Sequence, residues 1–232
     1  MKKGVILATV VASLISCSKP KIEDLSSYYF PFGELNSGKE YIYEVKTNNE
    51  VSSFTIRLKS EIAGNKKYLY TQNFVNNNLV SDSKEIVHSD NSVLLNGRFY
   101  EPANNGSPIA MKSKIDEKEN IVFSFNTSKG EGYSLQVSNQ SNLNNTTINY
   151  RRKREFAGFS QISFQGKKIN CIIIKCKEQF TYPTSELTLD VKEYFGQGIG
   201  LIKTEKKAPG LVIETTLKQI LPLNEQYPYS FN

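Results

Sequence analysis

Residues 39–47 read KEYIYEVKT, and this stretch decides the fold class. Tyr41, Tyr43 and Val45 fall on one face of an extended chain, whereas charged residues occupy most of the other face. Successive side chains of a strand point to opposite faces, so an alternation of period two is typical of a half-buried β-strand. We therefore predict a strand here, with one face in a core and one in solvent.

The same alternation recurs along most of the chain, separated by turn signals such as AGNK, QGKK and KAPG. No long stretch shows a helical period. This pattern predicts an all-β fold: an antiparallel curved sheet, a sandwich or a partly open barrel, with few or no helices. We expect one domain over residues 28–232, with a loop-like insertion near 101–120. The segment LLNGRFY predicts a hairpin that turns at Asn96-Gly97.

The first sixteen residues have the pattern of a signal peptide rather than of a strand. Two lysines precede an apolar run of about a dozen residues, which is too short to span a membrane. Residues 1–16 are therefore expected to be removed. The tetrapeptide LISC that ends at Cys17 resembles the bacterial lipobox, which implies a diacylglycerol on the Cys17 thiol, cleavage before it and acylation of the new amine. The alternative is an ordinary secretory signal with a chance cysteine. Residues 17–27 are expected to be the lipidated cysteine and a tether.

Two further stretches carry a second resemblance. YYFPFGELNSGKEYIYEV, beginning at Tyr28, resembles the opening of uncharacterised cell-envelope lipoproteins of Bacteroidota, with Tyr41 where tryptophan is common. VKEYFGQGIGLIKTE resembles the ending of a broader group of periplasmic β-proteins of unknown function. The resemblance implies a β-rich envelope protein and no established activity.

Aromatic residues are concentrated at both ends of the domain: Tyr28, Tyr29, Phe30 and Phe32 at its start, and Tyr227, Tyr229 and Phe231 at its end. We expect them to dock on the sheet and hold the termini; the alternative is a surface that stacks on sugars or contacts lipid. We expect the glycines at 196, 198 and 200 to form a turn or bulge with positive φ rather than a phosphate loop, because a strand follows them.

The charge of the chain is mildly basic. Two of its 29 lysines and arginines lie in the signal peptide, which leaves 27 against 23 acidic residues, a net charge of +4. Both signs are interspersed, so nucleic acid is not an expected partner. The expected partners are the membrane, reached through the lipid anchor, and an envelope protein or lipid. Because Ser18 rather than aspartate follows Cys17, we expect the outer membrane of the cell envelope, on a side that the sequence leaves open.

No residue pattern predicts a cofactor, a metal site or a catalytic site. The chain has a single histidine, His88, and no nucleophile or metal-ligand spacing accompanies it, so we interpret His88 as a surface or hairpin-end residue. Cys171 and Cys176 lie five residues apart in one expected strand, about 16 Å, whereas a disulfide requires Cα atoms within about 7 Å. We expect two free thiols.

One run of charge is a candidate site. YRRKREF contains four consecutive basic residues, Arg151, Arg152, Lys153 and Arg154. In a strand two of them face one side and two the other. The run is either an anion-binding patch for headgroups or acidic glycans, or a charged strand that discourages edge-to-edge pairing.

The sequence leaves three functional hypotheses. The first is a non-enzymatic binding or assembly module of the envelope. The second is a carrier of a hydrophobic ligand or lipid in a curved β-sheet cavity. The third is a glycan or peptidoglycan hydrolase, whose paired carboxylates are placed by the fold and not by sequence spacing.

Overall fold

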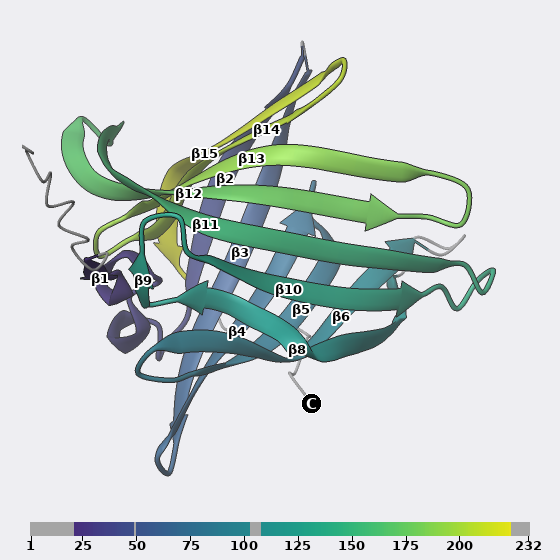
Figure 1. Cartoon of the computed structure of the whole chain (residues 1–232), viewed down its shortest axis with the longest axis horizontal. Coiled ribbons are helices and arrows are strands. Elements are labelled where there is room, and N and C mark those ends of the chain that lie inside the picture. Colours follow the sequence, from purple (N-terminus) through teal and green to yellow (C-terminus); the bar gives the residue numbers. More distant parts are fainter. Residues whose placement is uncertain (1–20, 49, 103–107, 224–232) are drawn as a thin grey trace, which may run out of the picture.

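A computed structural model of the chain describes residues 21–48, 50–102 and 108–223. Within these ranges the chain is almost entirely antiparallel β-structure (Figure 1). One sheet holds thirteen strands. β5 lies at one end of the strand order, and it also pairs with β6 near the other end. This pairing closes twelve of the strands into a barrel and leaves only β7 outside the ring. The predicted all-β antiparallel class is confirmed, and among the three predicted architectures the chain adopts a barrel.

The twelve strands of the barrel, in chain order, are β2 (Lys39–Thr47), β3 (Glu50–Ala63), β4 (Lys66–Val75), β5 (Asn78–Val87), β6 (Asn91–Pro102), β8 (Lys112–Ser124), β10 (Gly132–Gln140), β11 (Thr147–Phe164), β12 (Lys167–Thr181), β13 (Glu186–Gly196), β14 (Gly200–Ala208) and β15 (Leu211–Pro222). The short elements are β1 (Ile22–Asp24), β7 (Pro108–Ala110), β9 (Asn126–Ser128) and the 3-10 helices η1 (Ser26–Tyr28) and η2 (Phe32–Glu34).

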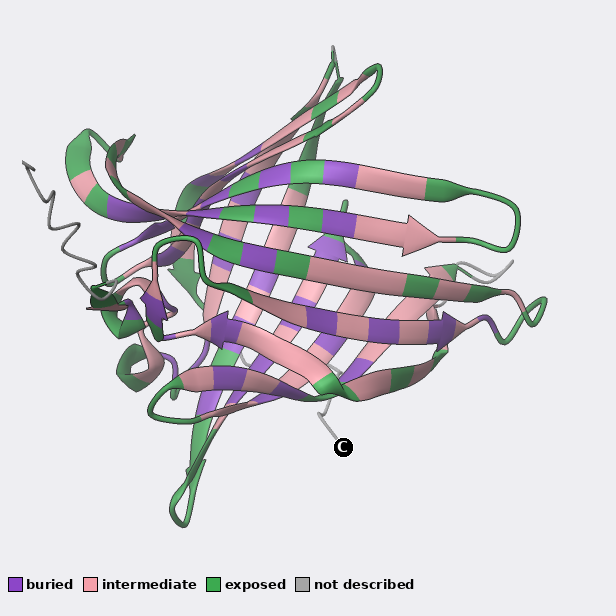
Figure 2. Cartoon of the chain, in the orientation of Figure 1, coloured by how far each residue is buried: buried purple, intermediate pink, exposed green. Residues whose placement is uncertain are grey.

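Each barrel strand turns alternate residues inward, which is what the period of two predicts. Figure 2 shows this alternation along β10 to β13, where buried bands are separated by intermediate or exposed ones. In β2, Tyr41 and Tyr43 are fully buried, and in β3 Ile56 and Leu58 are buried as well. The largest cluster of buried side chains combines these residues with others from β12, β13 and the segment before β2.

The segment that precedes β2 closes one end of the barrel (Figure 1, purple turns). Leu25 and Leu35 have no exposed surface, and Leu25 N–H donates to the carbonyl oxygen of Phe125 at 2.6 Å. Ser60 of β3 also holds this segment, since its hydroxyl donates to the Phe32 carbonyl at 2.8 Å. We call residues 25–38 the N-terminal plug. The expected docking of the opening aromatic residues is therefore found for Tyr29, which is buried in this core, and for Phe30, which packs against it. Tyr227, Tyr229 and Phe231 lie outside the described residues.

The tether is shorter than the sequence indicates. Residues up to 27 are expected to lie outside the domain, but Ile22–Asp24 forms β1, which pairs antiparallel with β9, and Leu25 is buried in the core. The reason is the hydrophobic effect. Leu25 packs in the same cluster as Tyr29 and Phe125 and is removed from water, which stabilises the docked chain by about 1.5–3 kcal/mol.

Two predicted turns or loops are strands instead. Asn96-Gly97 lies inside β6, and neither residue has the positive φ that a type I′ hairpin requires. The pairing of β5 with β6 shifts register between Lys84 and Glu85, so the local irregularity is a β-bulge and not a turn. The loop expected near 101–120 contains β7 and most of β8, which pairs with β10 and β6. Barrel closure supplies backbone partners to β8 although its sequence is mostly polar.

Candidate functional site

The barrel encloses a cavity of about 530 Å³. Its deep end contacts Tyr29 and Phe30 of the N-terminal plug. At its other end it is lined by exposed residues, Ser52, Ser53 and Val75, so it reaches solvent there. The cavity is thus a blind well, closed by the plug and open away from it. Pockets of about 300–1,000 Å³ are the size that holds a small organic ligand.

The walls of the well are apolar over most of their height. Near the middle, a buried cluster of Leu94, Leu135 and Val137 comes from β6 and β10. Phe99, Tyr150 and Phe180 also line the well, and the rings of Tyr150 and Phe180 contact each other with centroids 4.9 Å apart. Such walls bind apolar ligand surface by removing it from water.

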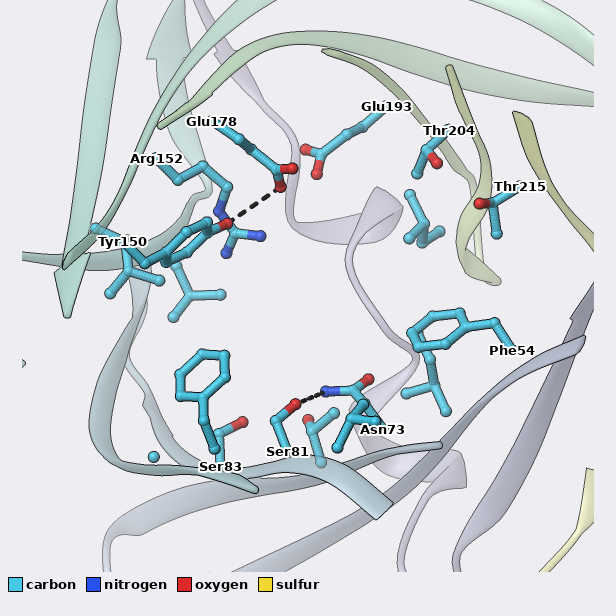
Figure 3. Close-up of a pocket in the computed structure, with 18 of the residues that line it drawn as sticks. Phe54, Asn73, Ser81, Ser83, Tyr150, Arg152, Glu178, Glu193, Thr204 and Thr215 are labelled. Atoms are coloured by element: carbon cyan, nitrogen blue, oxygen red, sulfur yellow. Dashed lines mark hydrogen bonds between the residues drawn. The ribbon is translucent and has the colours of Figure 1, made fainter. Parts of the chain in front are cut away.

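Charged side chains interrupt one wall, on β11 to β14 (Figure 3). The guanidinium of Arg154 forms a bidentate pair with the Glu193 carboxylate, with both N–O distances 2.8 Å. Arg154 also donates to the Val122 carbonyl oxygen. Both members of the pair are buried, and a bidentate geometry is what makes such burial tolerable.

A second pair lies beside it. Lys206 Nζ donates to Glu178 at 2.7 Å, and the Tyr150 hydroxyl donates to the same carboxylate at 3.1 Å. Burial acts to raise the pKa of Glu178, but the attraction of Lys206 and Arg152 and these hydrogen bonds outweigh it and lower the pKa below its ordinary value. Glu178 is therefore a carboxylate at neutral pH.

Glu85 is the carboxyl group of the well that contacts the N-terminal plug. The hydroxyls of Tyr29 and Ser92 both donate to its Oε2 at 2.5 Å. Burial raises the pKa of Glu85, and hydrogen bonds from the two hydroxyls only partly oppose this. Glu85 ties the plug, through Tyr29, to β5 and β6.

Arg152 is different from these groups. It faces the cavity from β11, opposite Glu178 in the register with β12, and Figure 3 shows its side chain reaching into the open space. Its buried Nε makes no hydrogen bond, and its guanidinium forms no ion pair with any side chain in the described parts of the chain. The hydroxyl of Thr204, on β14, is a second buried polar atom of the wall without a described partner.

The four basic residues of the predicted patch do not form one surface. Arg152 and Arg154 point into the barrel, whereas Lys153 is exposed outside. Arg151 also lies outside and pairs with Glu119 of β8 through two hydrogen bonds. The alternation of faces expected for a strand is confirmed, and it divides the run into an internal and an external pair.

Other sequence predictions have simple outcomes. Cys17 lies outside the described residues. Cys171 and Cys176 are free and buried in β12, as expected. His88 lies between β5 and β6, where its backbone N–H donates to Asn91, and no group of metal-ligating side chains is found in the described ranges. Gly198 and Gly200 have positive φ and β14 begins at Gly200, so the predicted turn is confirmed for these two glycines. Gly196 ends β13 without a positive φ.

Sequence reasoning missed the carboxylates of the wall, although a signal was present. Glu178 shares its strand face with Cys176 and Phe180, and Glu193 shares its face with Val191 and Phe195. A charge on the apolar face of a period-two strand indicates a buried polar site, because such residues are rarely buried without partners. The partners, Lys206 and Arg154, come from strands that are remote in sequence.

Comparisons with known proteins support the fold. No family model matches the chain, and no curated protein matches it significantly. It is similar to the structure of a "putative lipoprotein" from Parabacteroides distasonis ATCC 8503, with a TM-score of 0.57 and 14% identity over 83% of this chain and 97% of that one. It is also similar to a "putative exported protein with YmcC-like fold" from Bacteroides fragilis NCTC 9343, with a TM-score of 0.54 and 12% identity over 83% of this chain and 98% of that one.

At such identities the likeness shows a common YmcC-like fold and nothing about activity. The names of both neighbours agree with the class that the N-terminal sequence indicates, an exported protein or lipoprotein of a bacterial envelope. No helix within the described ranges is long and apolar enough to cross a membrane.

Proposed function

We propose that the chain is a lipid-anchored protein of the bacterial cell envelope that binds a small, largely apolar ligand inside its barrel without transforming it. This combines the binding-module and carrier hypotheses that the sequence leaves open. The observation that carries it is the blind well of about 530 Å³, with apolar walls and an opening away from the N-terminal plug. A protein that acted only as a scaffold would gain stability by filling this space with side chains.

Membrane attachment through Cys17 and placement in the outer membrane are parts of the same proposal. They are supported by the lipobox resemblance and by the names of the structural neighbours. Replacing Cys17 by serine should abolish incorporation of radiolabelled palmitate and release the protein from the outer-membrane fraction. Labelling that persists in Cys17→Ser would contradict the anchor, and fractionation of the wild type with the inner membrane would contradict the placement.

The binding proposal is tested with an uncharged apolar fluorophore, N-phenyl-1-naphthylamine, and the mature chain carrying Cys17→Ser. We expect saturable binding with enhanced fluorescence. Thr215 points into the cavity from β15 and Thr216 follows it on the other face, so Thr215→Phe should fill the well and weaken binding at least about tenfold. Thr216→Phe is the matched control and should leave binding unchanged. Equal binding by both variants, or none by the wild type, would contradict a ligand well and favour an assembly role.

A further inference from the structure

Three described basic residues line the well: Arg152, Arg154 and Lys206. Among them, only Arg152 forms no ion pair with a carboxylate. The carboxylates around it are already engaged by other groups. Glu193 is paired with Arg154, Glu178 with Lys206, Asp82 with Arg98, and Glu85 with two hydroxyls. Arg152 therefore brings a donor fork into the cavity that the described side chains do not use.

Apolar and aromatic groups lie against Arg152 on the side away from Glu178. Leu135 opposes it in the register with β10, and the Tyr150 ring lies 5.9 Å from its guanidinium carbon. Its Nε is shielded from solvent and makes no hydrogen bond. Leaving a buried donor without an acceptor costs about 1–3 kcal/mol, and more for a charged group. An acceptor supplied by a ligand would recover this free energy, so Arg152 favours an anionic group at mid-height in the well.

The side chains next to Arg152 indicate the chemistry of the ligand beyond its anionic group. Leu94, Leu135 and Val137 form an apolar cluster beside Arg152, with Phe99 and Val122 packed against it. A ligand that places an anion at Arg152 must therefore lay apolar surface along this wall. An amphiphile with a single chain satisfies both requirements.

The charge of the head group is limited by two neighbours. Glu178 and Glu193 lie on the same wall as Arg152, on β12 and β13 (Figure 3). Like charges that share a poorly solvated site repel strongly, so a second negative charge on the ligand would be unfavourable. A carboxylate carries one charge and matches the planar fork of arginine in a bidentate geometry.

We propose that the well binds a single-chain amphiphile with one carboxylate, whose oxygens accept hydrogen bonds from the Arg152 guanidinium while its chain lies along the wall of Leu94, Leu135 and Val137. This inference rests on the proposed function, because it specifies the ligand of the same cavity. It also relocates the anion site indicated by the basic run of β11 from the outer surface to the interior.

The test uses four ten-carbon probes, decanoate, decanol, decylamine and decyl phosphate, with the ionic probes below their micellar concentrations and decanol below its solubility limit. Each is titrated calorimetrically into the mature chain carrying Cys17→Ser at pH 8. A charge-assisted hydrogen bond contributes about 1.5–3 kcal/mol, so decanoate should bind at least about tenfold more tightly than decanol. Decyl phosphate should bind more weakly than decanoate, and decylamine should bind most weakly.

Variants assign the preference to one residue. Arg152→Met keeps a long side chain but removes the charge, and it should bring decanoate and decanol to within about threefold of each other while decanol binding stays as in the wild type. Arg151→Met, on the outer face of the same strand, is the matched control and should keep the full preference. If Arg152→Met does not fold, Arg152→Lys should retain a reduced preference for decanoate, and an undiminished one would overturn the role of the guanidinium fork.

The outcomes separate the two proposals. Equal affinity of the wild type for decanoate and decanol would overturn the inference and leave the proposed ligand well in place. Tighter binding of decyl phosphate than of decanoate would replace the carboxylate by a phosphate and also overturn it. A preference for decanoate that survives in Arg152→Met would place the anion elsewhere. Absence of binding by every probe would overturn the proposed function as well.

Discussion

The ring of Phe30 occupies the space where a side chain at position 200 would begin. A Cβ built on Gly200 would lie 2.3 Å from Phe30 Cδ1, well inside van der Waals contact. Phe30 in turn contacts Tyr41 of β2 edge-on, with ring centroids 5.6 Å apart. The opening aromatic segment and the closing glycine turn, far apart in sequence, are therefore one packing unit at the plugged end of the barrel.

This contact predicts a large effect for Gly200→Ala. Gly200 combines a φ of +95° with the clash against Phe30, so the free energy of unfolding should fall by about 2–5 kcal/mol. Gly198→Ala is the matched control, because Gly198 has a φ of +70° but a Cβ at that position would meet no atom within 4 Å, and it should cost only about 1–2 kcal/mol. Urea unfolding measures both. In a double-mutant cycle, Phe30→Ala should relieve part of the cost of Gly200→Ala; additive effects would contradict the contact.

The internal ion pair should be far more sensitive than the external one. Glu193→Gln leaves the buried charge of Arg154 without its counter-charge and should cost about 3–5 kcal/mol. Glu119→Gln breaks the partly exposed pair with Arg151 and should cost less than about 1 kcal/mol. Chemical denaturation compares them. Similar losses for both variants would mean that Arg154 is solvated in the folded protein.

Glu85 should make stability fall as the pH rises. Burial raises its pKa above the ordinary 4.5, so the folded state holds this proton more tightly than the unfolded state does. The contribution is fully present below about pH 4.5 and is lost as the pH rises through the folded value. Glu85→Gln can still accept from Tyr29 and Ser92, so it should gain stability relative to the wild type as the pH rises from about 5 to about 8. A difference from the wild type that is constant over this range would contradict the shift.

Cys176 should be inert in the folded protein. Burial, with repulsion from Glu193, raises the pKa of its thiol to about 12, so almost no thiolate exists at pH 8. Burial also raises the pKa of Cys171. In the Cys17→Ser chain, iodoacetamide should therefore modify neither cysteine before unfolding, and both in concentrated urea. Rapid modification at pH 8 without denaturant would show that β12 opens locally.

The proposed lipid anchor at Cys17, together with the short connection to the barrel, predicts an orientation of the protein on the membrane. Lys21 precedes β1 at the plugged end, and the four Cα-to-Cα steps from Cys17 to Lys21 span at most about 14 Å. A fluorophore at Gln165, on the β11–β12 turn at the plugged end of the barrel, should be quenched by bromolipids in liposomes. A fluorophore at Thr184, between β12 and β13 at the far end, should not be. Equal quenching would contradict a well that opens away from the membrane.

The sequence by itself determined the class of the fold and the faces of its strands. Tyr41 and Tyr43 are buried because alternate residues of a strand share a face, and in β2 that face packs on the core. Lys153 lies outside because it is on the opposite face of its strand from Arg152 and Arg154. The glycine turn could also be predicted locally, since glycine adopts a positive φ at little steric cost. These features are set by neighbours along the chain.

Only the tertiary structure decided which strands meet and what they enclose. Asn96-Gly97 became part of a strand because Lys84 and Ser83 of β5 pair with these two residues, and this pairing outweighs the local turn preference. Likewise, the pairs Arg154–Glu193 and Lys206–Glu178 form only once β11 to β14 are in register. Arg152 Nε has no hydrogen-bond partner in this arrangement. The alternation along one strand predicts which face a residue occupies. It does not predict which strands become neighbours in the barrel, and the charge pairs depend on those neighbours.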